Sequence, residues 1–227
     1  MSAAATPFIE LLLGLVRTFP NTMTAMSLVG GVALGRTPWV IMGAGAVSLA
    51  LLIIVLQLIT GSIATSTRTM DAAVIQACSM LPIATNSTYH YIPSLWVAVT
   101  TYFVTYILMN AVAVYTAPST KLPEEAMPVQ HRKSIGVVSI FAILLLAVTL
   151  LIVRLQSGCE YVWRLGPMAI PVGFLLAIGL GIGWAVAMRT AASASGDPNV
   201  SDVHGVMIGL QPGTLRTHPL ACAPKAS

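Results

Sequence analysis

Four long apolar segments that lack charged residues constrain this chain more than any other feature of its sequence. They cover residues 38–60, 94–116, 134–153 and 167–188, and Asp, Glu, Lys and Arg are absent from all four. The hydrocarbon core of a bilayer is about 30 Å thick, so a helix needs roughly 20 apolar residues to cross it. Each segment meets that length. The sequence therefore predicts an all-α membrane protein, a bundle of about four transmembrane helices.

The composition excludes several other classes of protein. Of the 227 residues, 56% are hydrophobic and 8% are charged, whereas soluble domains carry about 25% charged residues. This deficit excludes an ordinary soluble enzyme and a polar, disordered protein. The formal net charge of +4 does not indicate nucleic acid as a partner, because no basic run with interleaved aromatic residues accompanies it. Lys and Arg at the ends of membrane helices explain the charge better.

Residues 1–37 precede the first predicted span and form a separate N-terminal segment. Its apolar run 8–16 is too short to cross a bilayer, and Glu10 interrupts it. The apolar residues of this run share one face at helical spacing, and Arg17 follows them. This pattern predicts a helix that lies in the membrane interface, with the arginine reaching the headgroups.

Residues 22–35 form a second apolar stretch, which contains Gly30, Gly31 and Gly35. Because glycine disfavours the interior of a helix, we interpret this stretch as a broken interfacial or re-entrant piece. The alternative is a fifth span that begins at Met23. In both interpretations, residues 38–188 contain the four main spans.

The basic residues outside the spans are divided unevenly between the two sides of the membrane. With four spans, both termini lie on one side, together with the loop that joins the second span to the third. That side carries eight Lys and Arg, against three on the other side. The positive-inside rule then places the termini on the cytoplasmic side. Residues 189–227 are polar and proline-rich, and they are predicted to form an extended C-terminal arm that becomes ordered on a partner surface.

Aromatic and cysteine residues near the span ends give further predictions. Trp39 and Trp96 open two of the spans and are expected to act as interfacial anchors. Cys78 and Cys159 fall in loops on the same non-cytoplasmic face, where a disulfide is a candidate. The alternative is two buried free thiols. Asn86 begins an Asn-Ser-Thr sequon on that face and is a candidate glycosylation site.

No motif in the sequence has the spacing of a catalytic or metal site. Gly-x-Ser-x-Gly, His-Glu-x-x-His and Cys-x-x-Cys are all absent. We therefore expect no enzyme activity, no metal and no cofactor. The acidic residues lie outside the spans, whereas ion pumps and coupled transporters place ionisable groups within the membrane. Gln57 and Asn110, with hydroxyl residues such as Thr105, are the polar residues within the spans.

Small residues four positions apart occur in two of the spans. Gly179 and Gly183 form one such pair and Ala46 and Ala50 form another. This spacing lets the backbones of membrane helices approach closely, so both pairs are predicted to pack against other helices. With Gly181, the first pair also reads Gly-x-Gly-x-Gly, but a mid-span position does not suit a nucleotide loop, whose amides need access to a phosphate.

Several short motifs in the second half of the chain resemble a known group of proteins. They are YILMNAVAVY at 106–115, RKS at 132–134, RLQSGCE at 154–160, a glycine-rich span that ends in Gly183-Trp184, and PLACAP at 219–224. These motifs resemble uncharacterised multi-span proteins of large nucleocytoplasmic DNA viruses, among them viruses of algae and their marine relatives. The resemblance covers a little over half of the chain, from residue 96 onward.

The resemblance implies a structural role and carries over no catalytic residue. Such proteins look like internal-membrane and minor capsid-associated components of an icosahedral virion. The expected function is a structural integral membrane protein that anchors the internal membrane of a virion to the overlying capsid. Its expected partners are the lipid bilayer and capsid or other virion membrane proteins, with its termini on the capsid side and an oligomer as an option. A small pore or carrier without catalytic chemistry is the alternative.

Overall fold

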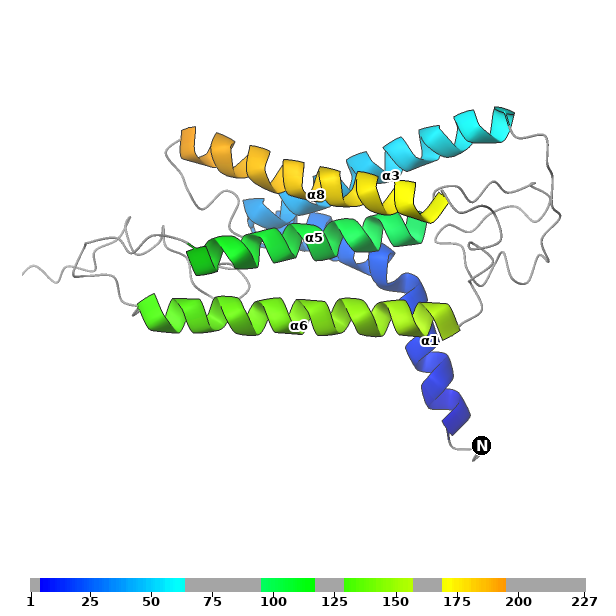
Figure 1. Cartoon of the computed structure of the whole chain (residues 1–227), viewed down its shortest axis with the longest axis horizontal. Coiled ribbons are helices and arrows are strands. Elements are labelled where there is room, and N and C mark those ends of the chain that lie inside the picture. Colours follow the sequence, from blue (N-terminus) through cyan, green and yellow to red (C-terminus); the bar gives the residue numbers. More distant parts are fainter. Residues whose placement is uncertain (1–4, 64–94, 117–128, 157–168, 195–227) are drawn as a thin grey trace, which may run out of the picture.

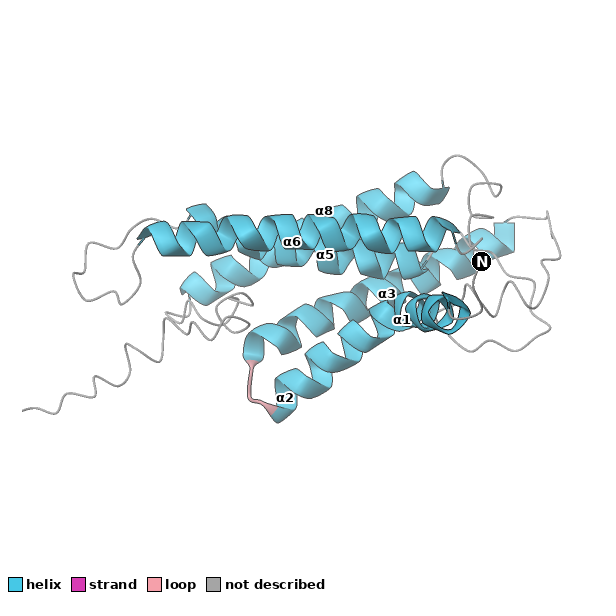
Figure 2. Ribbon diagram, turned by 90° about the horizontal axis from the view of Figure 1, so that it is seen from below, coloured by secondary structure: helices cyan, strands magenta, loops and turns pink. Residues whose placement is uncertain are grey.

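The structure, a computed structural model, describes residues 5–63, 95–116, 129–156 and 169–194, and these are helical except for the turn at residues 34–36. Figures 1 and 2 show no strand in this part of the chain. Five long helices make up most of it. They are α1 (Ala5–Ala25), α3 (Thr37–Ile63), α5 (Leu95–Thr116), α6 (Val129–Gln156) and α8 (Ala169–Ala194). A π-helical turn, η1 (Met26–Gly30), and a short α2 (Gly31–Ala33) continue α1 toward α3.

Four of these helices are long and apolar enough to cross a membrane, which confirms the predicted number of spans. The candidate spans are Thr37–Leu56, Leu95–Thr116, Lys133–Val153 and Gly173–Ala192. Their limits differ from the predicted ones by a few residues, most clearly in α8, which runs past Arg189. Arginine is a good helix former and its long side chain can reach the membrane surface, so it does not end the helix.

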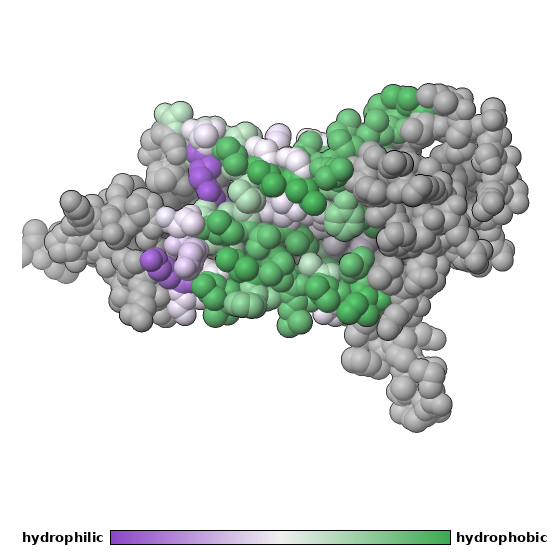
Figure 3. Space-filling view, viewed as in Figure 1, coloured by the Kyte–Doolittle hydropathy of each residue, from purple (hydrophilic) through white to green (hydrophobic). Residues whose placement is uncertain are grey.

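The central helix of the bundle is α5, which packs against α3, α6 and α8 (Figure 1). Within its candidate span, 44% of the residues are buried inside the chain, against 11% for α6. The outer surface of α6 instead exposes large apolar side chains such as Phe141 and Leu145. A helix that is apolar on all sides and still exposed fits a lipid environment. Figure 3 shows the corresponding apolar surface, with hydrophilic residues at one end.

A tight turn joins α2 to α3. Gly35 has φ of +62°, the left-handed conformation in which helices commonly end on glycine. The Arg36 N–H donates to the Gly31 carbonyl at 2.7 Å, and the Gly35 N–H donates to the Val32 carbonyl at 3.1 Å. These are the two hydrogen bonds of a Schellman motif. The next helix then begins with Pro38 in its first turn, where a missing N–H costs little.

The N-terminal segment differs from its prediction in one respect. Gly30 and Gly31 were expected to break the helix, yet helical structure continues from Ala5 to Ala33. The physical reason is that Gly31 is buried against α3, where packing outweighs its low helix propensity. The position of this segment at the membrane interface stays a prediction.

The first turn of α1 and the last turn of α8 are separated along the long axis of the bundle in Figure 1. That both termini lie on one side of the membrane stays a prediction, because the described residues include neither terminus. Residues 195–227, which make up most of the predicted arm, lie outside the described residues. The part at 189–194 is the last stretch of α8.

Candidate functional site

Three helices meet at Gly45, in the first half of α3. This glycine is buried. A Cβ at this position would overlap the Tyr102 Oη of α5 and would lie 2.8 Å from the Trp184 Nε1 of α8. Only a residue without a side chain allows both aromatic groups to reach the backbone of α3 here.

The two aromatic groups donate hydrogen bonds to neighbouring carbonyls of α3. Tyr102 Oη donates to the Met42 carbonyl at 3.1 Å, and Trp184 Nε1 donates to the Ile41 carbonyl at 3.0 Å. A carbonyl has two lone pairs, so it can accept these bonds besides a helical one. In a membrane, buried polar groups need such partners within the protein. We call these five residues, Ile41, Met42, Gly45, Tyr102 and Trp184, the Gly45 lock.

Aromatic and aliphatic side chains fill the interior around the Gly45 lock. The Tyr102 ring stacks on Tyr106, with centroids 5.8 Å apart, and meets the edge of Phe103 at 5.7 Å. Leu49 and Ile53 of α3 are fully buried in the same cluster. Offset and edge-to-face rings contribute stability beyond the area that they bury. The centre of the bundle is therefore a packed core.

The polar residues within the spans are the ones that a pore or carrier would need along its path. The described ones lie in separate contacts. Asn110 is 3% exposed, and its Nδ2 donates to the Tyr106 carbonyl one turn earlier on α5. Thr105 packs against Gly181 of α8, where a Cβ would lie 3.0 Å from the Thr105 Cβ. Gln57 belongs to α3, but its side chain lies outside the described part. The two described residues thus contribute to helix structure and packing.

Three buried polar atoms have no hydrogen-bond partner within the described part of the chain. They are Trp39 Nε1, Thr100 Oγ1 and Tyr106 Oη. Leaving such a group unpaired costs about 1–3 kcal/mol, so the core of α5 is less completely satisfied than the Gly45 lock beside it. Two of the three atoms belong to α5, which also carries three of the four buried polar residues of the described part, Thr100, Thr101 and Asn110.

A further hydrogen bond joins the N-terminal helix α1 to α5, and Pro20 explains why its acceptor is available. Proline has no N–H, so the Val16 carbonyl four residues earlier loses its helical donor. Trp96 Nε1 of α5 donates to that carbonyl at 3.0 Å, and the bond is buried. Leu150 of α6 completes a small second core with Val16 and Trp96. The indole of Trp96 is thus buried against α1, and its position at the membrane interface stays a prediction.

Replacing Trp96 with phenylalanine should lower the free energy of unfolding by about 1–3 kcal/mol, because the Val16 carbonyl would be buried without a donor. In a Pro20→Ala background the loss should be smaller, since a backbone N–H is restored at position 20. Residues that share one hydrogen bond typically show a coupling of about 0.5–3 kcal/mol in such a cycle. Thermal unfolding of the four variants in detergent measures it. Equal losses in both backgrounds would contradict the assigned role of Pro20.

The small residues of α8 pack differently from the prediction. Gly179 and Gly183 are exposed, and a Cβ at either would have no neighbour within 4 Å. The prediction that this pair packs against another helix is wrong for the helices that the structure describes. Gly181, which lies between them, is buried against Thr105 instead. Residues two apart lie about 200° apart around a helix, so only one of the two glycine faces can meet α5.

The small residues of α3 lie on its packed side. Ala46 is 1% exposed and belongs to the main core. Ala50 is partly buried and packs against the same core. This is the arrangement that their four-residue spacing favours.

The remaining candidate sites are a metal site, a disulfide and a glycosylation site. The described residues contain no group of three or more His, Cys, Asp or Glu that could hold a metal ion. Cys78, Cys159 and Asn86 lie outside the described residues, so the disulfide and the glycosylation site stay predictions. A comparison with protein families, curated proteins and solved structures finds no match to this chain.

Proposed function

We propose that this chain is a structural integral membrane protein of a virion, which anchors the internal membrane to the overlying capsid. The observation that carries the structural role is the packed core around the Gly45 lock. Two hydrogen bonds tie α5 and α8 to α3 there, and filled aromatic packing surrounds them. A rigid bundle of this kind suits an anchor. The virion and capsid part of this proposal rests on the sequence motifs described above.

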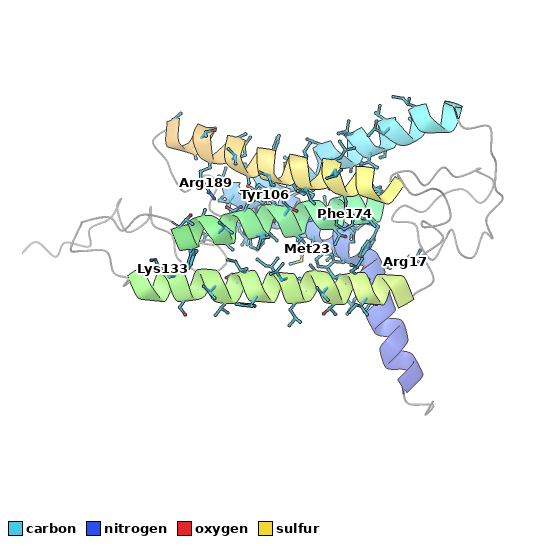
Figure 4. The ribbon with its side chains drawn as sticks, in the orientation of Figure 1. Arg17, Met23, Tyr106, Lys133, Phe174 and Arg189 are labelled. Carbon is cyan, nitrogen blue, oxygen red and sulfur yellow. The ribbon has the colours of Figure 1, made fainter. Side chains whose placement is uncertain are left out.

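One end of the bundle carries basic residues, and this supports placing the capsid contact at that end. Lys133 and Arg189 lie at this end, near the start of α6 and the end of α8 (Figure 4). Lys133 Nζ lies 6.0 Å from the centroid of the Tyr115 ring, within reach of a cation–π contact. Gly136 lets the two helices approach here, since a Cβ would lie 3.1 Å from the Tyr115 Cβ. We propose that this end faces the capsid and that residues 195–227 form the docking arm.

A small pore or carrier is the second candidate. The unpaired Thr100 Oγ1 and Tyr106 Oη favour it, because buried polar groups without partners in a membrane helix are unusual. The two candidates differ in a direct measurement. Liposomes that contain the full chain should hold ions and small solutes as well as empty liposomes do if the chain is an anchor. Rapid leakage would favour the pore.

Deleting residues 195–227 should leave membrane insertion intact but abolish incorporation into virus particles. The truncation point follows the end of α8, so all four candidate spans remain. Mass spectrometry of purified particles and of host membranes measures the two outcomes. Gly183→Ala, a change with no neighbour within 4 Å, is the control that should incorporate normally. Normal incorporation of the truncated chain would refute the docking arm, and absence of the full chain from particles would refute the virion role.

A further inference from the structure

The N-terminal segment between Arg17 and Arg36 contains no charged residue. It is helical up to Ala33, through the end of α1, η1 and α2. At about 1.5 Å per residue, the helical residues 18–33 extend about 24 Å. The hydrocarbon core of a bilayer is about 30 Å thick. The length of this segment therefore comes close to that of a membrane crossing.

The segment packs against α3 through glycines on both helices. A Cβ on Gly31 would lie 2.8 Å from the Val40 Cγ2. A Cβ on Gly43 would lie 2.6 Å from the Ser27 Oγ and 2.7 Å from the Leu28 Cγ. Close approach of backbones at small residues is typical of helix pairs in membranes. Figure 2 shows η1 and α2 alongside the first part of α3, after the tight turn.

Two hydroxyl groups of the segment donate hydrogen bonds to carbonyls within it. Thr24 Oγ1 donates to the Pro20 carbonyl at 2.8 Å, and Ser27 Oγ donates to the Thr24 carbonyl at 2.9 Å. The Schellman motif at Gly35 pairs carbonyls at the end of the segment. Segments in lipid need this internal pairing because no water is present to replace it.

The second half of the segment exposes apolar side chains, whereas Thr18, Asn21 and Thr22 are exposed in its first half. Met26, Val29 and Val32 are 56%, 69% and 71% exposed, and residues three apart share one helix face. The adjoining helix α3 is a candidate span with exposed Leu51 and Val55 of its own. Lipid acyl chains that contact α3 would therefore meet this apolar side as well.

Arg17, which precedes the segment, lies toward the end of the bundle opposite Lys133 and Arg189 (Figure 4), and the segment runs from there to the turn that joins α2 to α3 (Figure 2). We propose that residues 18–35 form a fifth membrane-crossing element, whose exposed side contacts lipid acyl chains. The start of α1 then lies on the opposite side of the membrane from the end of α8.

Protease protection of the full chain tests the sidedness. One epitope is fused to the N-terminus and another to the C-terminus, and sealed vesicles of one orientation are treated with protease. The expected result is that one epitope is digested while the other is protected until detergent is added. Digestion or protection of both epitopes together would overturn the fifth crossing.

A pair of charge substitutions tests the lipid contact. Val29→Arg places a cation in the middle of the segment, whereas Leu15→Arg places one beyond Arg17, at a position that is also exposed, by 62%. An arginine in the hydrocarbon is strongly unfavourable. We expect Val29→Arg to reduce the membrane-inserted, folded fraction several-fold and Leu15→Arg to leave it unchanged.

The other outcomes of this pair contradict the proposal in distinct ways. Normal insertion of both variants would place residue 29 in water, as in an interfacial helix. Normal insertion of Val29→Arg together with loss of an oligomer would mean that a second copy of the chain, and not lipid, covers this side. Both results would be visible by size-exclusion chromatography of the protein extracted in detergent.

Discussion

Replacing Gly45 with alanine should destabilise the bundle by about 2–4 kcal/mol, through overpacking and the loss of one or both hydrogen bonds of the Gly45 lock. The new Cβ would overlap Tyr102 Oη and crowd Trp184 Nε1. Neither ring can move away without breaking its hydrogen bond to α3. The higher helix propensity of alanine offsets only about 1 kcal/mol of this loss. Thermal or denaturant unfolding in detergent measures the change.

Two further variants make the Gly45 result specific. Gly183→Ala is the matched control, because its Cβ would meet nothing within 4 Å, and its effect should stay within about 0.5 kcal/mol. Tyr102→Phe removes the Oη that the new Cβ overlaps, so it should recover part of the stability that Gly45→Ala loses. Wild-type stability of Gly45→Ala alone would contradict the Gly45 lock.

Replacing Gly181 with leucine should reduce stability by about 3 kcal/mol or more, at the upper end of the range for overpacked cores. A Cβ there would lie 3.0 Å from the Thr105 Cβ and 3.4 Å from the Tyr102 carbonyl oxygen. The second contact is with backbone, which cannot rotate away as a side chain can. The extra carbons of leucine would therefore push α8 away from the central helix. A fall in the thermal midpoint in detergent reports this change.

Gly183→Leu on the same helix is the control for Gly181→Leu. It adds the same side chain to an exposed position that has no neighbour within 4 Å. We expect a change within about 0.5 kcal/mol, as for other surface substitutions. Similar losses for the two leucine variants would show that α8 packs through a different face.

Hydropathy predicted the spans but not the face that each span buries. The number of spans follows from length and from the absence of charge, which the bilayer itself imposes. The choice between Gly181 and the pair of Gly179 and Gly183 depends on where α5 lies. Because α8 is apolar on every side, its sequence has no polar stripe to mark the lipid-facing surface. Four-residue spacing alone favoured the wrong face.

The contacts that tie the helices together also escaped prediction. Trp96 was assigned to the membrane interface from its place at the start of a span, yet it binds a carbonyl 80 residues away. The signal was present in Pro20, which deprives Val16 of its helical donor. It could not be used without knowing that this part of the chain is a helix. Trp184 and Gly45 gave no comparable local signal, because their contact joins residues far apart in the sequence.

The Gly45 lock has a consequence for the order in which the bundle is assembled. Its donor on α8 lies 143 residues after the Ile41 carbonyl, so synthesis must reach the final described helix before the lock can close. Until then, the surface of α3 at Gly45 lacks Trp184, and α5 contacts it through Tyr102. Chains are synthesised from the N-terminus and begin to fold before they are complete. Closure of the lock therefore distinguishes a chain that has completed α8 from one that stopped before it.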